Sequence, residues 1–469
     1  MSTETKQGQQ VSFAAAIAEV WRIALPLMIS TGTFSLVLFA DRTLLLKYDG
    51  ASMSAAMTGG NLFWVLVCLP MGIVSMTGAI VSQYIGAGKP ERVGRFLWQS
   101  VWISLSFTPF FIALAYFAPW IFRATGQPES LIDLNSIYFR ILMIGAVGQV
   151  LETALSGFFS GTERTGTVMW VSIVSGLINL LADYLLIFGM LGLPEMGIKG
   201  AAIASVISFW FKVVVYGWLL TRPRFEAVYQ FSSGRAWDRG MLVKLIFFGF
   251  PTGLMYLNEA GAFTVMVLRI GTLGDVPLRA TTMAINFNMI AFIPLIGVSI
   301  AASVLVGRHL TETGPNRAAK SVAAAMAIGL VYSSLWMIAF LTIGDVMMSL
   351  YEFNSDGEDS ARAIELSRGL LGFVAIYVVL DATQLILAGA LRGAGDTWFV
   401  LFGGITASAI ALSIGFAFEP SVANIGSGTS YNAGLNWWWT VLALWVCLLA
   451  VLMALRFATG QWRKMRMVD

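Results

Sequence analysis

Long apolar runs recur throughout this 469-residue sequence, and they constrain its fold more than any other feature. A helix that crosses a lipid bilayer needs about 20 predominantly apolar residues. Twelve such runs are separated by turn or charge clusters, at residues 15–45, 56–85, 96–118, 135–159, 168–190, 200–220, 244–270, 281–306, 320–348, 366–391, 398–417 and 437–458. The sequence therefore predicts an all-α integral membrane protein with twelve transmembrane helices.

Composition supports the membrane class and argues against several others. Only 12% of the residues are charged, whereas soluble domains carry about 25%. The net charge is +3 without a long basic run, so nucleic acid is not an expected partner. Cys68 and Cys447 lie in apolar runs, and the single histidine, His309, falls in a predicted cytoplasmic loop where we expect it to be solvated. We therefore expect no disulfide framework, no zinc or haem site and no cofactor.

Lysine and arginine concentrate in alternate loops. If the N-terminus is cytoplasmic, the basic segments 89–95, 222–244, 308–320 and 456–466 all fall on the cytoplasmic side. Cytoplasmic loops of membrane proteins carry an excess of these residues. The sequence therefore predicts that both termini are cytoplasmic.

The two halves of the sequence resemble each other. A constant shift of 225 along the chain matches Pro26 with Pro251, Gly72 with Gly297, Pro90 with Pro315 and Arg92 with Arg317. A shift of 232 overlays GFFSGTERT on GALRGAGDT. Because each copy has six helices, both enter the membrane from the same side, and a cavity is expected between two similar bundles. We predict an N-terminal six-helix lobe at 1–221, a cytoplasmic linker at 222–244 and a C-terminal six-helix lobe at 245–469.

Five polar side chains inside predicted spans are candidates for function, because an ionisable residue there costs at least about 2.5–3.5 kcal/mol. They are Asp41, Asn179, Asp183, Glu259 and Asp381. The first and third lie at the same predicted depth, and Asn179 and Asp183 share one helix face. Carboxylate and amide oxygens are the ligands that hard cations prefer. A buried carboxylate can hold a proton, a sodium ion or a cationic ligand, one at a time, as an antiporter requires.

Structural roles are the alternatives for these residues. Asp41 could form an interfacial pair with Arg42, which follows it directly. Asn179 and Asp183 could be a helix–helix hydrogen-bond pair without a transport role. Glu259 has Asn258 beside it and no basic residue nearby in sequence, and Asp381 is flanked by Thr383 and Gln384, so a purely structural role is less favoured for both.

Several sequence segments resemble the multidrug and toxic compound extrusion (MATE) family, most closely its bacterial NorM-like branch. They are ADRTLLL, SQYIGAGKPERV, GFFSGTERT, INLLADYLLIFG, GIKGAAIASVIS, FGFPTGLMYLNEAGAF and LDATQLILAGALRGAGDT. The resemblance covers nearly the whole chain. It implies two six-helix lobes that form a V in the bacterial cytoplasmic (inner) membrane. It also implies that a monomer exports amphipathic organic cations in exchange for Na⁺ or H⁺.

The resemblance also assigns roles to individual residues. Asp41, Asn179 and Asp183 match the family's N-lobe cation site, and Ser205 occupies a position where threonine is common. Glu259 and Asp381 match the C-lobe carboxylates used for cation coupling. On this basis Asp41, Asn179, Asp183, Glu259 and Asp381 are expected to bind a monovalent cation only. Asp41, Glu259 and Asp381 are also expected to contact substrate. Arg42 departs from the family pattern and could weaken cation binding beside it.

Two other functions compete with drug export. A flippase for lipid-linked saccharides, from the same superfamily, would line its cavity with basic residues for a diphosphate, and Lys212 is the only clear mid-span candidate. A membrane-embedded transferase would need a convergent nucleophile, base or metal cluster, and none is visible. The sequence therefore favours a transporter and not an enzyme.

Overall fold

The computed structural model describes residues 12–125, 129–352, 358–420 and 430–468, and every regular element within these ranges is a helix. Twelve helical segments of the described chain are long and apolar enough to cross a membrane. The prediction of an all-α protein with twelve spans is therefore confirmed.

The first six spans occupy the N-terminal half. They are α1 (Phe13–Tyr48), α2 (Gly50–Ser75) with α3 (Thr77–Gly86), α4 (Glu91–Ser106) with α5 (Thr108–Ala124), α6 (Glu129–Gly161), α7 (Thr165–Phe188) and α8 (Ile198–Leu220). The short helix α9 (Pro223–Tyr229) follows them, within the segment predicted as a linker.

The other six spans occupy the C-terminal half. They are α10 (Arg239–Gly271), α11 (Asp275–Glu312), α12 (Pro315–Thr342), α14 (Glu358–Ala394), α15 (Thr397–Ala417) and α16 (Ser430–Ala458). The prediction that the ninth span reaches residue 348 is wrong, because α12 ends at Thr342 and a separate helix, α13 (Gly344–Glu352), follows.

Local sequence signals set several helix ends. The Ser12 hydroxyl accepts a hydrogen bond from the Ala15 N–H at the start of α1, and Asp49 and Asp238 cap α2 and α10 in the same way. These side chains satisfy N–H groups that have no partner within the helix. At the other end of a helix, α7 stops at Gly189, whose left-handed backbone favours glycine.

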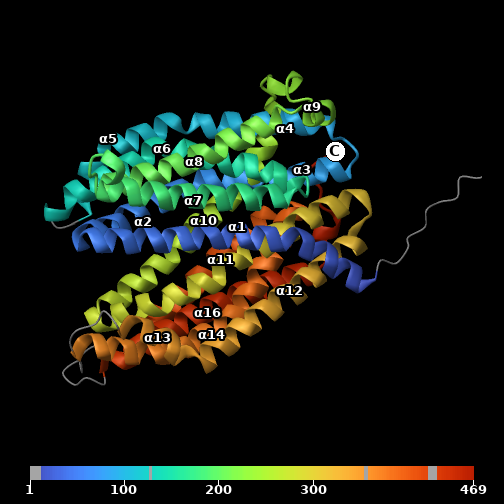
Figure 1. Ribbon diagram of the computed structural model, residues 1–469. Coiled ribbons are helices and arrows are strands. Elements are labelled where there is room, and N and C mark those ends of the chain that lie inside the picture. Colours follow the sequence, from blue (N-terminus) through green and yellow to red (C-terminus); the bar gives the residue numbers. More distant parts are fainter. Residues whose placement is uncertain (1–11, 126–128, 353–357, 421–429, 469) are drawn as a thin grey trace, which may run out of the picture.

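The two halves form two lobes arranged as a V (Figure 1). They lie together at the end of the molecule that carries α9 and the C terminus, and they diverge towards the end that carries α5 and α13. At the first end, which we call the closed end, a Cβ on Gly86 would lie 2.4 Å from the Arg308 carbonyl oxygen. The Thr311 hydroxyl there donates to the Gln83 carbonyl across the interface.

The helices that cross between the lobes follow the internal repeat. A Cβ on Gly72 in α2 would lie 2.2 Å from the Gly253 Cα in α10, and a Cβ on Gly297 in α11 would lie 2.5 Å from the Met28 nitrogen in α1. The repeat shift takes Gly72 to Gly297 and takes Met28 to Gly253. The same pair of positions therefore makes the contact twice, as a parallel repeat requires.

Candidate functional site

The N-terminal lobe buries three of the predicted site residues on two neighbouring helices. Asp41 lies in α1, and Asn179 and Asp183 lie in α7. All three side chains are withdrawn from solvent, with Asp183 fully buried. Polar groups that are buried inside a membrane protein need partners, so their surroundings decide what they can do.

Close packing of α1 on α7 brings these residues to one depth. A Cβ on Gly176 in α7 would lie 2.9 Å from Thr33 Cγ2 and 3.0 Å from Val37 Cγ2 in α1. The two helices are the first and fifth spans, so they run in the same direction. At about 1.5 Å per residue, Asp41 lies roughly 6 Å beyond Val37, while Asn179 and Asp183 lie roughly 4.5 and 10.5 Å beyond Gly176. Asp41 therefore lies at a depth between those of Asn179 and Asp183.

Four oxygens of this group have no hydrogen-bond donor in the part of the chain that the structure describes. Asp41 Oδ1, Asn179 Oδ1 and both carboxylate oxygens of Asp183 are buried without a hydrogen-bond partner. The two carboxylates also interact electrostatically with each other. An unpaired buried carboxylate is costly, so this arrangement fits a site for a proton or a monovalent cation. It does not fit a helix–helix hydrogen bond made by these oxygens.

One further side chain borders the N-lobe group, and a second lies on a neighbouring helix. Tyr138 of α6 is buried and interacts electrostatically with both carboxylates. Ser205 lies in α8, which packs on α7 through a 2.7 Å hydrogen bond between the Ser175 and Ser208 hydroxyls. Because α8 runs opposite to α7, the step back from Ser208 to Ser205 leads towards the depth of Asn179.

The C-terminal lobe brings Glu259 and Asp381 together from different helices. Glu259 in α10 is half-buried, Asp381 in α14 is buried, and the two carboxylates interact electrostatically. Glu259 also interacts with Cys68 of α2, so it lies on the side of α10 that faces the other lobe.

Arg392 is a neighbour of Glu259 that sequence reasoning missed. Its guanidinium interacts electrostatically with Glu259, lies 5.8 Å from the centroid of the Tyr256 ring and donates to the Ser299 hydroxyl. Arg392 directly follows the predicted span 366–391 and comes 11 residues after Asp381. Its reach towards α10 could not be seen from that position.

An ion pair inside the N-terminal lobe was also missed. Lys212 Nζ in α8 lies 3.8 Å from Glu152 Oε1 in α6, and both side chains are mostly buried. This pairing neutralises the one mid-span basic candidate for binding a diphosphate.

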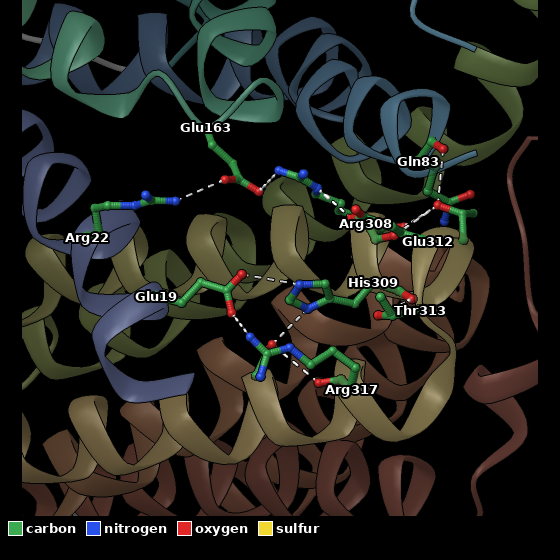
Figure 2. Close-up of polar contacts among 12 residues, drawn as sticks. Glu19, Arg22, Gln83, Glu163, Arg308, His309, Glu312, Thr313 and Arg317 are labelled. Carbon is green, nitrogen blue, oxygen red and sulfur yellow. Dashed lines mark hydrogen bonds and ion pairs between the residues drawn. The ribbon is translucent and has the colours of Figure 1, made fainter. Parts of the chain in front are cut away.

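The interpretation of His309 as a solvated loop residue is wrong. α11 continues through His309 to Glu312, and the imidazole is buried. Its Nδ1 lies 2.9 Å from the Ser321 hydroxyl, and its Nε2 lies 3.3 Å from Glu19 of the other lobe (Figure 2).

Within the described ranges, no group of three or more histidine, cysteine or acidic residues could hold a metal ion. The fold and its two groups of carboxylates are those of a multi-pass membrane transporter.

Comparisons with known proteins identify the family. A model of the MatE family matches residues 26–185 and 251–418, segments that begin at the repeat-related prolines Pro26 and Pro251. The multidrug resistance protein NorM of Burkholderia vietnamiensis is 29% identical, over 93% of this chain and 92% of its own. The chain belongs to the MatE family, and it is a transporter and not an enzyme.

Solved structures agree on the fold. A MATE transporter in complex with MaL6 superimposes with a TM-score of 0.85 at 18% identity, over 96% of this chain and 98% of its own. A MOP superfamily transporter from Pyrococcus furiosus superimposes with a TM-score of 0.84 at 18% identity, over 96% of this chain and 97% of its own.

Proposed function

We propose that this chain is a cation-coupled multidrug antiporter that exports amphipathic organic cations by alternating access. The observation that carries the proposal is the set of buried, unpaired oxygens of Asp41, Asn179 and Asp183. These oxygens favour binding of a proton or a monovalent cation, because they lie in a low-dielectric site without hydrogen-bond donors. The name of the NorM relative, a multidrug resistance protein, supports export of drugs.

The geometry supports a proposal of two coupling sites. Asp41, Asn179 and Asp183, with Ser205 at their edge, form the N-lobe site for Na⁺ or H⁺. Glu259 and Asp381 form the C-lobe site, where Glu259 faces the other lobe and can meet substrate. Asp41, Glu259 and Asp381 bind coupling ion and organic cation in turn, because one carboxylate neutralises one cation at a time.

Exchange requires two states of the molecule. The coupling ion must bind one state more tightly than the other to shift their equilibrium. We infer that residues 1–221 and 245–469 move as two bodies joined by the linker 222–244. In this proposal the protein is a monomer in the bacterial inner membrane, and both termini are cytoplasmic. The arrangement in Figure 1, with the lobes apart at the end that carries α5 and α13, is then the outward-open state.

The flippase is the second candidate, and one observation disfavours it. A site for a lipid diphosphate needs unpaired basic groups, whereas Lys212 is paired with Glu152. The unpaired buried groups of the N-lobe site are oxygens, which favour a cationic ligand.

Ethidium efflux from drug-sensitive cells that express the protein tests the proposal. Efflux is measured with a sodium gradient, with a proton gradient and with neither, for wild type, Asp41→Asn and Glu259→Gln. Asp275→Asn is the matched control, because Asp275 is an exposed carboxylate at the start of α11. We expect gradient-driven efflux in wild type and the control, and its loss in at least one site variant. Absence of efflux from wild type under both gradients would overturn drug export.

A further inference from the structure

A basic side chain accompanies the buried oxygens of the N-lobe site. Arg42 follows Asp41 directly in α1, so it lies at nearly the same depth. The Arg42 side chain is only partly exposed, whereas Lys47 later in α1 and Lys199 at the start of α8 are exposed. Arg42 is therefore the cation that the fold brings to this site.

The guanidinium of Arg42 reaches the same space as the carboxylates. It interacts electrostatically with Asp41 and with Tyr138 of α6. Tyr138 is buried, and a Cβ on Gly59 of α2 would lie 3.2 Å from its ring. Tyr138 interacts in turn with both carboxylates of the site. The guanidinium, the phenol and the two carboxylates therefore lie together between α1, α6 and α7.

The charges of this group do not balance without one coupling ion. In the described chain, the groups that act on Asp41 and Asp183 are Arg42, Tyr138 and the carboxylates themselves. Two ionised carboxylates and one guanidinium leave a single negative charge, and buried net charge is costly. One added proton or one added monovalent cation makes the group neutral, so the site takes one coupling charge and not two.

The unpaired oxygens are divided unevenly between the two carboxylates. Both oxygens of Asp183 are buried without a hydrogen-bond partner, whereas only Oδ1 of Asp41 is. Asp41 is also the carboxylate on which Arg42 acts. Asp41 can therefore stay ionised beside the guanidinium, and the charge that remains to be neutralised is that of Asp183.

A sodium ion needs more of this site than a proton does. A hard cation is held by several oxygen ligands at once, and here they would come from Asp41, Asn179 and Asp183 together. The guanidinium of Arg42 competes for the first of these ligands. A proton needs a single oxygen, and both oxygens of Asp183 are available for it.

We propose that Arg42 is a tethered counter-cation that makes the N-lobe site selective for a proton over Na⁺. This inference rests on the proposed function, for which it names the coupling ion at one of the two sites. Arg42 stays in the protein throughout the cycle, so it takes the place of an ion that would otherwise bind between the two aspartates. Release of the proton then leaves one uncompensated charge in the site.

Thermal unfolding in detergent tests ion binding without any transport assay. Glu259→Gln and Asp381→Asn are introduced first, so that the C-lobe carboxylates cannot respond, and we call this variant the parent. Its melting temperature is measured while NaCl replaces choline chloride at constant ionic strength, and while the pH is lowered in choline chloride. A ligand that binds only the folded state raises the melting temperature.

Removal of the positive charge should create a sodium site. We expect acid to stabilise the parent and NaCl to leave it unchanged. Arg42→Thr and Arg42→Gln should each gain a stabilisation by NaCl, with an apparent Na⁺ affinity about tenfold or more above that of the parent. Addition of Asp183→Asn should abolish this gain, because it removes a sodium ligand.

Two variants serve as matched controls. Arg42→Lys retains the positive charge beside Asp41, so it should stay insensitive to NaCl. Lys47→Gln removes an exposed positive charge five residues further along the same helix, so it should also behave like the parent.

Equal responses to NaCl in the parent and in both neutral Arg42 variants would overturn the proposal. Weaker Na⁺ binding in those variants would also overturn it, because Arg42 would then be holding Asp41 in place for sodium. Binding of radioactive sodium to the parent gives a test that needs no Arg42 variant to fold: binding that Asp183→Asn abolishes would contradict proton selectivity. These readouts are independent of dye efflux, so the ion preference can fail while drug export stands, and drug export can fail while the ion preference stands.

Discussion

Gly72 and Gly253 bring the backbones of α2 and α10 into direct contact where the two lobes cross. A Cβ added to Gly72 would lie 2.2 Å from the Gly253 Cα and 2.5 Å from its nitrogen. Neither atom belongs to a flexible side chain that could turn away. The lobes can cross at this distance only while both positions are glycine.

The first prediction follows from this contact. Gly72→Ala should force the helices apart and destabilise the protein by about 1–3 kcal/mol, as overpacking of a tight interior does. Gly60→Ala in the same helix is the control, since its Cβ would meet only the Tyr138 ring at 3.8 Å. Thermal unfolding in detergent measures the difference. Equal melting temperatures for the two variants would contradict the close crossing.

The second prediction concerns the N-lobe site. If Asp41 and Asp183 hold a cation, Na⁺ or acid should raise the melting temperature of wild type, because a ligand that binds only the folded state stabilises it. Asp183→Asn should abolish that increase and stabilise the ion-free protein, because it removes a buried charge that lies beside another. Melting curves in NaCl and in choline chloride, each at two pH values, check this. Asp275→Asn should retain the wild-type response.

The helices of this fold were predictable because their signal is local. Each span needs only an apolar run of sufficient length, and the deviation at the ninth span arose because apolar residues continue from α12 into α13 across the helix end at Thr342. Asp41, Asn179 and Asp183 stood out for a related reason, since a polar residue in an apolar run is visible without any partner.

The partners of such residues could not be predicted. Glu152 lies inside the predicted span 135–159, and its counterpart Lys212 comes much later in the sequence, on another helix. Polar residues around His309 indicated a loop, whereas the structure extends the helix there and satisfies the imidazole across the lobe interface. Pairings between distant segments depend on how helices pack, and a single sequence does not specify that packing.

The third prediction tests the ion pair between Glu152 and Lys212. Lys212→Met leaves the Glu152 carboxylate mostly buried and without its partner, so it should lower stability by about 2–4 kcal/mol. Addition of Glu152→Gln should recover most of this loss, because the remaining buried group is neutral. A double-mutant cycle of unfolding free energies measures the coupling. Additive losses in the double variant would mean that the two side chains do not depend on each other.

The fourth prediction concerns Arg392, whose positive charge acts on Glu259 from the Tyr256 ring. A fixed cation near a carboxylate competes with a mobile one, so Arg392→Gln should tighten binding of the coupling ion by about threefold to tenfold. Slower exchange should accompany the tighter binding, because the ion must leave Glu259 before an organic cation can occupy it. The ion concentration that gives half-maximal dye efflux from proteoliposomes measures the first effect, and the maximal rate measures the second. Arg392→Lys retains the charge and should stay close to wild type in both. A weaker apparent ion affinity in Arg392→Gln would instead mean that Arg392 holds Glu259 in its binding orientation.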